Sequence, residues 1–249
     1  MLELKNVSFT VTVDGKEKNI IKNISLNVPD NKMVAVTGPN GGGKSTLAKL
    51  IAGIERVTSG NIIFNGVDIT DMSVTDRAKL GIGFAFQQPV KFKGITVFDL
   101  LRIASGKKIS IKEACEYLSS VGLCARDYIS REVNASLSGG ELKRIEIATV
   151  TAREAALSIF DEPEAGIDLW SFRNLTEVFR RMRERIKDSS IIIISHQERI
   201  LETADEIVVL KDGELLRHGS RDDILPGLIG TSSAISDCKM GAVKGGEAE

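Results

Sequence analysis

The stretch MVAVTGPNGGGKST, residues 33–46, decides the fold of this chain. An apolar run leads into a glycine-rich loop, and Lys-Ser-Thr then opens a helix-forming segment at residues 45–53. The loop matches G-x-x-x-x-G-K-[ST], in which backbone N–H groups and a helix N-terminus cradle phosphate. We expect Lys44 to reach the outer phosphates and Ser45 to ligate Mg²⁺. The predicted phosphate-binding residues are Gly38, Asn40, Gly41, Gly42, Gly43, Lys44, Ser45 and Thr46.

Composition places the 249 residues in the soluble globular class, with 42% hydrophobic and 27% charged residues. The net charge of −1 gives no bulk reason to expect a nucleic acid or a membrane surface as partner. The basic run 180–185 is more typical of a solvated helix face than of nucleic-acid binding. Because no apolar run suits a signal peptide or a membrane span, the sequence predicts a cytoplasmic protein. Cys115, Cys124 and Cys238 lack the spacing of a metal site or a disulfide framework.

Alternating strand and helix patterns predict a layered α/β core. The predicted strands are residues 3–9, 20–28, 33–37, 61–64, 82–86, 156–160, 190–195 and 207–210. The continuously apolar runs at 33–37, 157–160 and 191–194 are expected at the sheet centre. Between residues 96 and 153 the apolar residues recur at helical spacing, which predicts an inserted helical subdomain. The core is then 1–95 with 154–228, and 229–249 is a flexible extension after a short helix beyond Gly219.

A second set of polar residues follows two further predicted strands. LSIFDE, residues 157–162, delivers Asp161 and Glu162 to the edge where parallel sheets bind ligands. Because neighbouring residues of a strand face opposite sides, we assign Asp161 to the Mg²⁺ shell and Glu162 to the attacking water. His196 follows the strand IIIIS, and a γ-phosphate contact or a capping role fits it. His218, expected in a turn, receives no functional role.

The segment LSGGE, residues 137–141, precedes a long helix-forming stretch. Ser138 is expected as the N-cap of that helix. A second anion-binding helix N-terminus is surplus within one chain, because the first loop already holds the γ-phosphate. We therefore expect Ser138, Gly139 and Gly140 of one subunit to close on the nucleotide of another, in a C₂ dimer.

Taken in order, GPNGGGKST, Gln87, LSGGE, LSIFDE, the AGID that ends at Asp168, and His196 resemble the ATPase subunits of the ATP-binding-cassette (ABC) superfamily. The resemblance implies a P-loop NTPase (RecA-like) core with antiparallel β-strands and an inserted helical subdomain. It also implies head-to-tail dimers that sandwich two ATP. Gln87 would then sense Mg²⁺, and Asp168 would link the two subunits. The family usually stacks adenine on an aromatic residue, but Val11 stands at that place here, or Phe9 in a shifted register.

Within the superfamily, several stretches resemble the SufC ATPases of iron–sulfur cluster assembly. These stretches are AFQQPVKFKGITV at 85–97, LSGGELKRIEI at 137–147 and SHQERIL at 195–201. The resemblance implies a soluble SufB/SufD-like scaffold as partner, docked near Phe92, and an ATP-dependent homodimer. Pro163 and Glu164 after the carboxylates are more typical of transporters, so the ATPase subunit of a membrane importer is the alternative.

Overall fold

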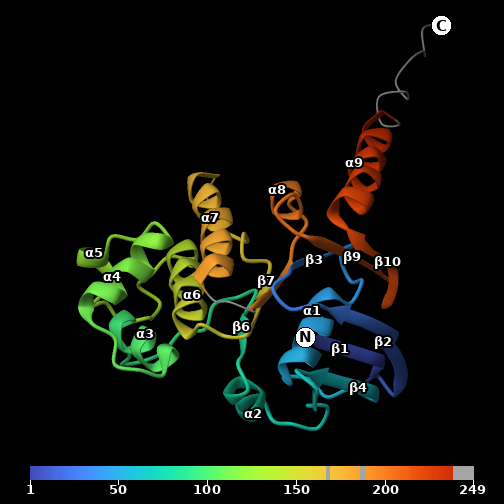
Figure 1. Cartoon of the computed structure of the whole chain (residues 1–249), viewed down its shortest axis with the longest axis horizontal. Helices are drawn as coiled ribbons and strands as arrows, with labels where there is room; N and C mark the ends of the chain where they lie inside the picture. Colours follow the sequence, from blue (N-terminus) through green and yellow to red (C-terminus); the bar gives the residue numbers. More distant parts are fainter. Residues whose placement is uncertain (167–168, 186–188, 238–249) are drawn as a thin grey trace, which may run out of the picture.

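The computed structural model describes residues 1–166, 169–185 and 189–237 (Figure 1). Two sheets and the helices around them form the described chain. The six-stranded sheet has the order β10-β9-β3-β8-β7-β6, and only its edge pair β9 and β10 is antiparallel. Its strands are β3 (Met33–Thr37), β6 (Ile82–Ala85), β7 (Leu157–Asp161), β8 (Ser190–Ile194), β9 (Glu206–Lys211) and β10 (Glu214–Ser220). The three strands predicted for the sheet centre, β3, β8 and β7, are indeed adjacent.

A smaller antiparallel sheet has the order β2-β1-β4-β5. Its strands are β1 (Leu2–Val13), β2 (Lys16–Val28), β4 (Ser59–Phe64) and β5 (Val67–Asp68). Helix α1 (Lys44–Ala52) packs between this sheet and one face of the large one, because its buried Leu47, Leu50 and Ile51 belong to the core that the two sheets share. The phosphate loop is thereby fixed between two sheets.

The central strands are buried on both faces, and their side chains alternate between two cores. Val34, Ile159 and Ile192 face α1 and the antiparallel sheet. Met33, Phe160 and Ile193 face the helices of the opposite layer. Phe160 meets Phe179 of α7 (Leu169–Arg185) edge to face, with ring centroids 4.9 Å apart.

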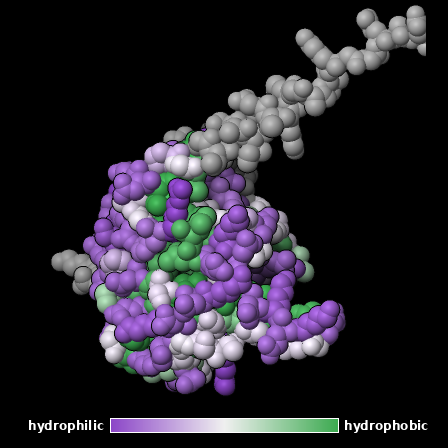
Figure 2. Space-filling view, turned by 90° about the vertical axis from the view of Figure 1, so that its right-hand side faces the viewer, coloured by the Kyte–Doolittle hydropathy of each residue, from purple (hydrophilic) through white to green (hydrophobic). Residues whose placement is uncertain are grey.

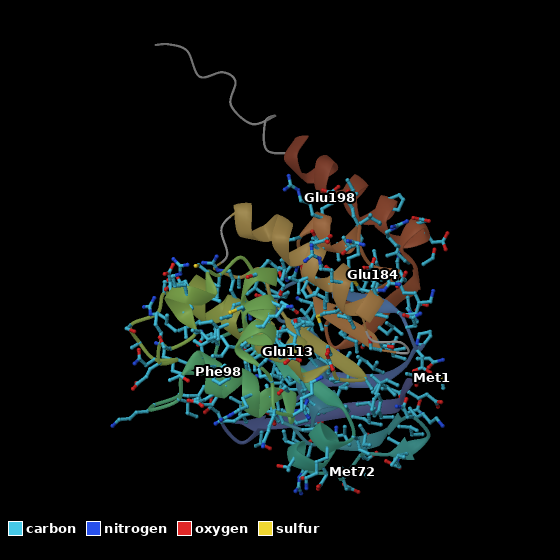
Figure 3. The ribbon with its side chains drawn as sticks, turned by 60° about the vertical axis from the view of Figure 1, so that its left-hand side comes forward. Met1, Met72, Phe98, Glu113, Glu184 and Glu198 are labelled. Carbon is cyan, nitrogen blue, oxygen red and sulfur yellow. The ribbon has the colours of Figure 1, made fainter. Side chains whose placement is uncertain are left out.

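The opposite layer is helical and corresponds to the predicted inserted segment. It contains α3 (Val97–Ser105), α4 (Ile111–Ser120), α5 (Ala125–Tyr128) and α6 (Gly139–Arg153). Thr96, Ser110 and Ser138 cap α3, α4 and α6, each accepting a backbone N–H in its first turn. Figure 3 shows this part of the molecule with Phe98 of α3 and Glu113 of α4 labelled. The expected fold class, an ABC-type α/β core with antiparallel strands and a helical subdomain, is confirmed.

Several local predictions were wrong or incomplete. His218 lies in strand β10 and not in a turn, and its Nε2 is 2.9 Å from Glu206 Oε2 on the neighbouring strand. The helix after Gly219 is α9 (Arg221–Asp237), much longer than predicted, so residues 229–237 are helical. The prediction of flexibility for 238–249 and the position of Cys238 lie outside the described residues. The short elements β5, α2 (Val74–Lys79) and α8 (Glu198–Leu201) carry too little periodicity to be recognised.

The surface on the side of β2, β10 and α9 is mostly hydrophilic, with a narrow hydrophobic band across it (Figure 2). Over the ranges that the structure describes, no helix is both long and apolar enough to span a bilayer.

Arg77 of α2 is a buried cation that ties three segments together. Arg77 is only 1% exposed, and its guanidinium donates hydrogen bonds to four backbone carbonyls. The acceptors are the carbonyl oxygens of Leu50, Ile51, Thr70 and Met72, at 2.6 to 3.2 Å. Two of these carbonyls belong to the last turn of α1, whose negative dipole end favours a cation. Arg77 therefore closes the C-terminus of the phosphate-loop helix.

We expect Arg77→Met to lower the free energy of unfolding by about 3 kcal/mol, because buried carbonyls lose their donors. Urea denaturation followed by circular dichroism measures the loss. The matched control is Arg56→Met, at an exposed position, with an expected change within about 0.5 kcal/mol. Equal losses in the two variants would contradict the role of Arg77.

Candidate active site at the carboxyl edge of the central sheet

The phosphate loop leaves β3 and curls back over the start of α1. Gly38 passes so close to β9 that a Cβ would lie 1.9 Å from the carbonyl oxygen of Leu210. Gly43 is the N-cap of α1 with φ +98°, a left-handed conformation that glycine adopts without strain. No side chain caps α1, in contrast to α3, α4 and α6. The first N–H groups of α1 therefore remain able to bind an anion, as the predicted cradle requires.

Lys44 lies at the floor of this loop. Its Nζ donates to the carbonyl oxygens of Gly38 and Pro39, both at 2.9 Å, and the residue is 6% exposed. Burial lowers the pKa of the Lys44 ammonium, while the carboxylates of Glu162 and Asp161 oppose that shift. The loop thus holds a cation that its own carbonyls only partly compensate.

Asp161 and Ser45 meet across the sheet edge. The Ser45 hydroxyl donates to Asp161 Oδ1 at 2.9 Å. Burial raises the pKa of Asp161, and the hydrogen bond from Ser45 opposes the rise. A hydroxyl and a carboxylate beside a phosphate cradle are the hard oxygen ligands that Mg²⁺ takes together with substrate phosphates. The donor set therefore fits the predicted ion.

Glu162 comes directly after β7 and leaves the strand geometry. Its φ of +46° is unusual for a residue with a side chain, and such strain concentrates at functional sites. Gln87 Nε2 donates to Glu162 Oε2 at 2.7 Å. His196 Nε2 lies 3.9 Å from Glu162 Oε1, beyond hydrogen-bond distance. The structure thus brings Gln87, Glu162 and His196 together beside the phosphate loop.

A buried hydrogen bond connects the loop after Glu162 with the end of β8. The Ser195 hydroxyl, fully buried, donates to Glu164 Oε1, and Ser195 Oγ accepts from the Gln197 N–H at 3.0 Å. Burial raises the pKa of Glu164, and Ser195 opposes the rise. Sequence reasoning took Glu164 only as a transporter-like feature and did not anticipate that it fixes the strand end that carries His196.

The signature segment, residues 137–141, begins α6 with reciprocal hydrogen bonds. Ser138 Oγ accepts from the Glu141 N–H at 3.3 Å, and Glu141 Oε2 accepts from the Ser138 N–H at 2.6 Å. The hydrogen bond from the Tyr128 hydroxyl to the Glu141 carboxylate, and after it the one from the Ser138 N–H, lower the pKa of Glu141 to about 2. Ser138 is therefore the N-cap of α6, as predicted. Ser138 and Gly139 are exposed, so this helix start faces outward.

The remaining predicted site residues are Val11, with Phe9 as its alternative, and Asp168. Val11 is half-buried and pairs with Lys18 across the β1–β2 hairpin. Phe9 packs against the core beneath that hairpin, which leaves Val11 as the candidate for an apolar base contact. Asp168 lies outside the described residues.

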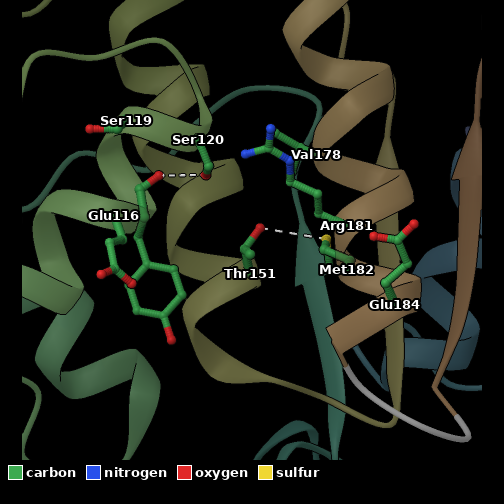
Figure 4. Close-up of a pocket in the computed structure, with 9 residues that line it drawn as sticks. Glu116, Ser119, Ser120, Thr151, Val178, Arg181, Met182 and Glu184 are labelled. Carbon is green, nitrogen blue, oxygen red and sulfur yellow. Dashed lines mark hydrogen bonds between the residues drawn. The ribbon is translucent and has the colours of Figure 1, made fainter.

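A cavity of about 590 Å³ lies in the helical layer, between α4, α6 and α7 (Figure 4). A hydrogen bond of 3.5 Å from Thr151 Oγ1 to Met182 Sδ crosses its floor. The cavity is lined by Glu116, Tyr117, Ser119, Ser120, Thr151, Val178, Arg181, Met182 and Glu184. None of the predicted site residues belongs to this lining.

Sequence reasoning missed two further charged residues next to the cluster, Lys143 and Glu146 of α6. Lys143 Nζ donates to backbone carbonyls at the ends of β6 and β7, and it is 3.3 Å from Glu146 Oε2. The available signal was two opposite charges at i and i+3 within an otherwise apolar helix face. That spacing is equally common on solvated helices, so it did not stand out.

The fold and this edge define a P-loop nucleotide-binding protein. The family described as ABC transporter matches residues 21–165. An uncharacterized ABC transporter ATP-binding protein of Methanocaldococcus jannaschii is 39% identical in an alignment of 215 residues that covers 83% of this chain and 85% of that protein. The probable ATP-dependent transporter ycf16 of Antithamnion sp. is 34% identical over 237 residues, 89% of this chain and 92% of that protein.

A solved ATP-binding cassette, in a dimeric post-hydrolysis state bound to ADP and Pi, has the same fold. The TM-score is 0.80 at 24% identity, over 89% of this chain and 99% of that one. With the family match over more than half of its length, this chain belongs to the ABC transporter family. It is an ABC ATPase, which binds and hydrolyses ATP.

The geometry around His196 predicts its titration. Burial, and after it the Lys44 charge, lowers the pKa of His196, while Glu162 opposes the shift. These effects favour the neutral imidazole. In Lys44→Met the nearby positive charge is gone, so we expect the NMR titration midpoint of His196 to move to higher pH. The chain has only two histidines, and the His218 signal is the internal reference. A midpoint unchanged by Lys44→Met would contradict this electrostatic contact.

Proposed function

We propose that the carboxyl edge of the central sheet is the ATP hydrolysis site, with Gly38 to Thr46 holding the phosphates. The proposal rests on the observation that residues at the ends of four parallel strands lie together at this edge of the sheet. Lys44 follows β3 and Gln87 follows β6. Asp161 ends β7, Glu162 comes directly after it, and His196 follows β8. The hydrogen bonds from Ser45 to Asp161 and from Gln87 to Glu162 join side chains far apart in sequence.

Ser45, Asp161 and Gln87 are proposed to hold Mg²⁺ with the phosphates. The ion, when bound, neutralises charge that develops on the phosphate oxygens. Lys44 exchanges its two loop carbonyls for phosphate oxygens, which satisfies the ammonium with an anion. Asp161, whose pKa is raised by burial, gains the positive partner that favours its ionised form.

Glu162 is proposed to orient and deprotonate the attacking water, with His196 as a neutral γ-phosphate contact. Gln87 donates a hydrogen bond to Glu162 and so lies beside the proposed sites of the γ-phosphate and Mg²⁺. Its contacts therefore depend on whether phosphate and ion are bound. The signature residues Ser138 and Gly139, both exposed, and the half-buried Gly140 are proposed to meet the nucleotide of a second subunit, and Asp168 to link the two. A C₂ dimer then completes two sites at once.

We expect Glu162→Gln to retain ATP binding while the turnover rate falls by about 10² to 10⁴, because the amide cannot accept the proton of water. The variant is also expected to accumulate as an ATP-dependent dimer, which gel filtration with ATP detects. Lys44→Ala is the comparison variant, and it should lose nucleotide binding itself. Turnover that is unchanged in Glu162→Gln would refute the proposed role.

We further propose that the ATPase drives a conformational change in a SufB/SufD-type scaffold of iron–sulfur cluster assembly. The segment after β6 supports this proposal. Phe92 is half-buried, packs against the helical core and donates its N–H to the Val133 carbonyl at 2.8 Å, so it is fixed on the helical layer. Exposed Lys91 and Lys93 flank it, and Val90 is 45% exposed. An apolar side chain between two cationic side chains is complementary to a protein surface that carries both acidic and apolar groups.

The alternative is the ATP-binding subunit of a membrane importer. Pro163 after the carboxylates favours it, as does the similarity to the probable ATP-dependent transporter of Antithamnion sp.. Both functions use the same ATP chemistry, so only the partner distinguishes them.

Affinity capture from the native cells separates the two partners. We expect the chain to retain a soluble SufB/SufD-like scaffold, and Phe92→Ala to weaken that complex about tenfold while ATP binding stays intact. Phe98→Ala, a half-buried aromatic in the same layer, is the matched control. Capture of a membrane permease in place of the scaffold would sink the Suf proposal.

A further inference from the structure

Lys143 and Glu146 form an ion pair inside the protein, on the α6 face that meets the central sheet. The side chain of Lys143 is 1% exposed and that of Glu146 is 13% exposed, with Nζ and Oε2 3.3 Å apart. Their helix neighbours Leu142, Ile145 and Ile147 are buried apolar residues. Because an apolar pair could fill this space without the desolvation cost of two charges, packing alone does not explain the pair.

The backbone carbonyls that Lys143 binds lie at the ends of two strands. Its Nζ donates to the carbonyl oxygens of Phe86, Gln87 and Asp161, the last two at 3.4 Å. Phe86 is the first residue after β6, and Asp161 is the last residue of the neighbouring β7. One ammonium therefore bridges the two strand ends that carry Gln87 and the adjacent carboxylates Asp161 and Glu162.

Glu146 binds the other backbone polar group of Phe86. Its Oε1 accepts from the Phe86 N–H at 2.9 Å. The N–H and the C=O of Phe86, which no longer belong to the sheet ladder, are thus both bound by side chains of α6. Burial raises the pKa of Glu146, and Lys143 is the first of the groups that oppose this rise. The two residues depend on each other.

We propose that Lys143 and Glu146 are positioning residues of the ATPase reaction, a buried clamp that fixes the backbone of Gln87 and Asp161 relative to the signature helix. The inference rests on the roles proposed for Gln87 and Asp161. The clamp touches neither the phosphate loop nor any reacting atom. Its effect is on the geometry of hydrolysis and not on the binding of the nucleotide.

The first test is Lys143→Met, which keeps the length of the side chain and removes its three donor contacts. We expect kcat to fall by about 100-fold, because small displacements of catalytic groups are costly. The dissociation constant for ATP should change by less than about threefold, since the phosphate loop keeps its contacts. An unchanged kcat would overturn the proposal.

A double variant separates positioning from stability. Lys143→Met leaves Glu146 as a buried carboxylate without its cationic partner. The double variant Lys143→Met with Glu146→Gln removes both charges of the pair and keeps an acceptor for the Phe86 N–H. We expect the double variant to regain thermal stability but not kcat. Recovery of both together would show that the pair only stabilises the fold, and would overturn the proposal.

Two comparison variants complete the experiment. Lys107→Met removes a lysine that pairs with Glu154 at 2.9 Å with its side chain 51% exposed, and kcat should stay unchanged. Gln87→Ala tests the proposed function itself. If Gln87→Ala lowers kcat and Lys143→Met does not, the positioning role of Lys143 is refuted while the proposed role of Gln87 stands. If Gln87→Ala has no effect, the role of Gln87 fails, and the Lys143 variants still decide the clamp through Asp161.

Discussion

The parallel pairing of β6, β7, β8 and β3 is the constraint on which the whole site depends. Its hydrogen bonds continue one residue past the strands, since the Glu162 N–H donates to the Ile194 carbonyl at 3.0 Å and the Ser195 N–H to the Val36 carbonyl at 3.2 Å. These hydrogen bonds fix the position along the strand direction at which each loop leaves the sheet. The side chains that follow therefore meet at one edge, although more than a hundred residues separate Ser45 from Asp161.

Burial sets the electrostatic character of that edge. It lowers the pKa of Lys44 and raises the pKa of Asp161, so each charged form is less well solvated than in water. The hydrogen bonds that compensate are few, two carbonyls for Lys44 and one hydroxyl for Asp161, and the nearby opposite charges do not cancel either shift. A polyanion that carries a divalent cation supplies both missing partners in one step. The site is thus matched to a ligand with two signs of charge, which is the electrostatic basis of the proposed function.

The sequence was sufficient for the fold class, because each of its strongest signals is local. The apolar runs of β3, β7 and β8, the glycine-rich loop and the Ser138 cap are all short patterns that need no tertiary contact to be recognised. The missed features are contacts between distant segments. Lys143 and Glu146 resemble a solvated helix pair until β6 is placed against them, and Glu164 acquires a partner only when β8 pairs with β7. His218 was misplaced because the strand character of β10 comes from pairing with β9, and not from its own apolar pattern.

Helix α6 changes from exposed to buried within its first five residues. Its start, at Ser138 and Gly139, is exposed and carries the capping box of Ser138 and Glu141, whereas Lys143, four residues beyond Gly139, is buried against the strand ends. Four residues of helix span about 6 Å, a length over which a helix behaves as a rigid rod. A displacement of this helix start would therefore also displace the buried charges. Because Lys143 binds the backbone carbonyls of Gln87 and Asp161, such a displacement would reach the proposed hydrolysis site through the strand ends and not through the phosphate loop.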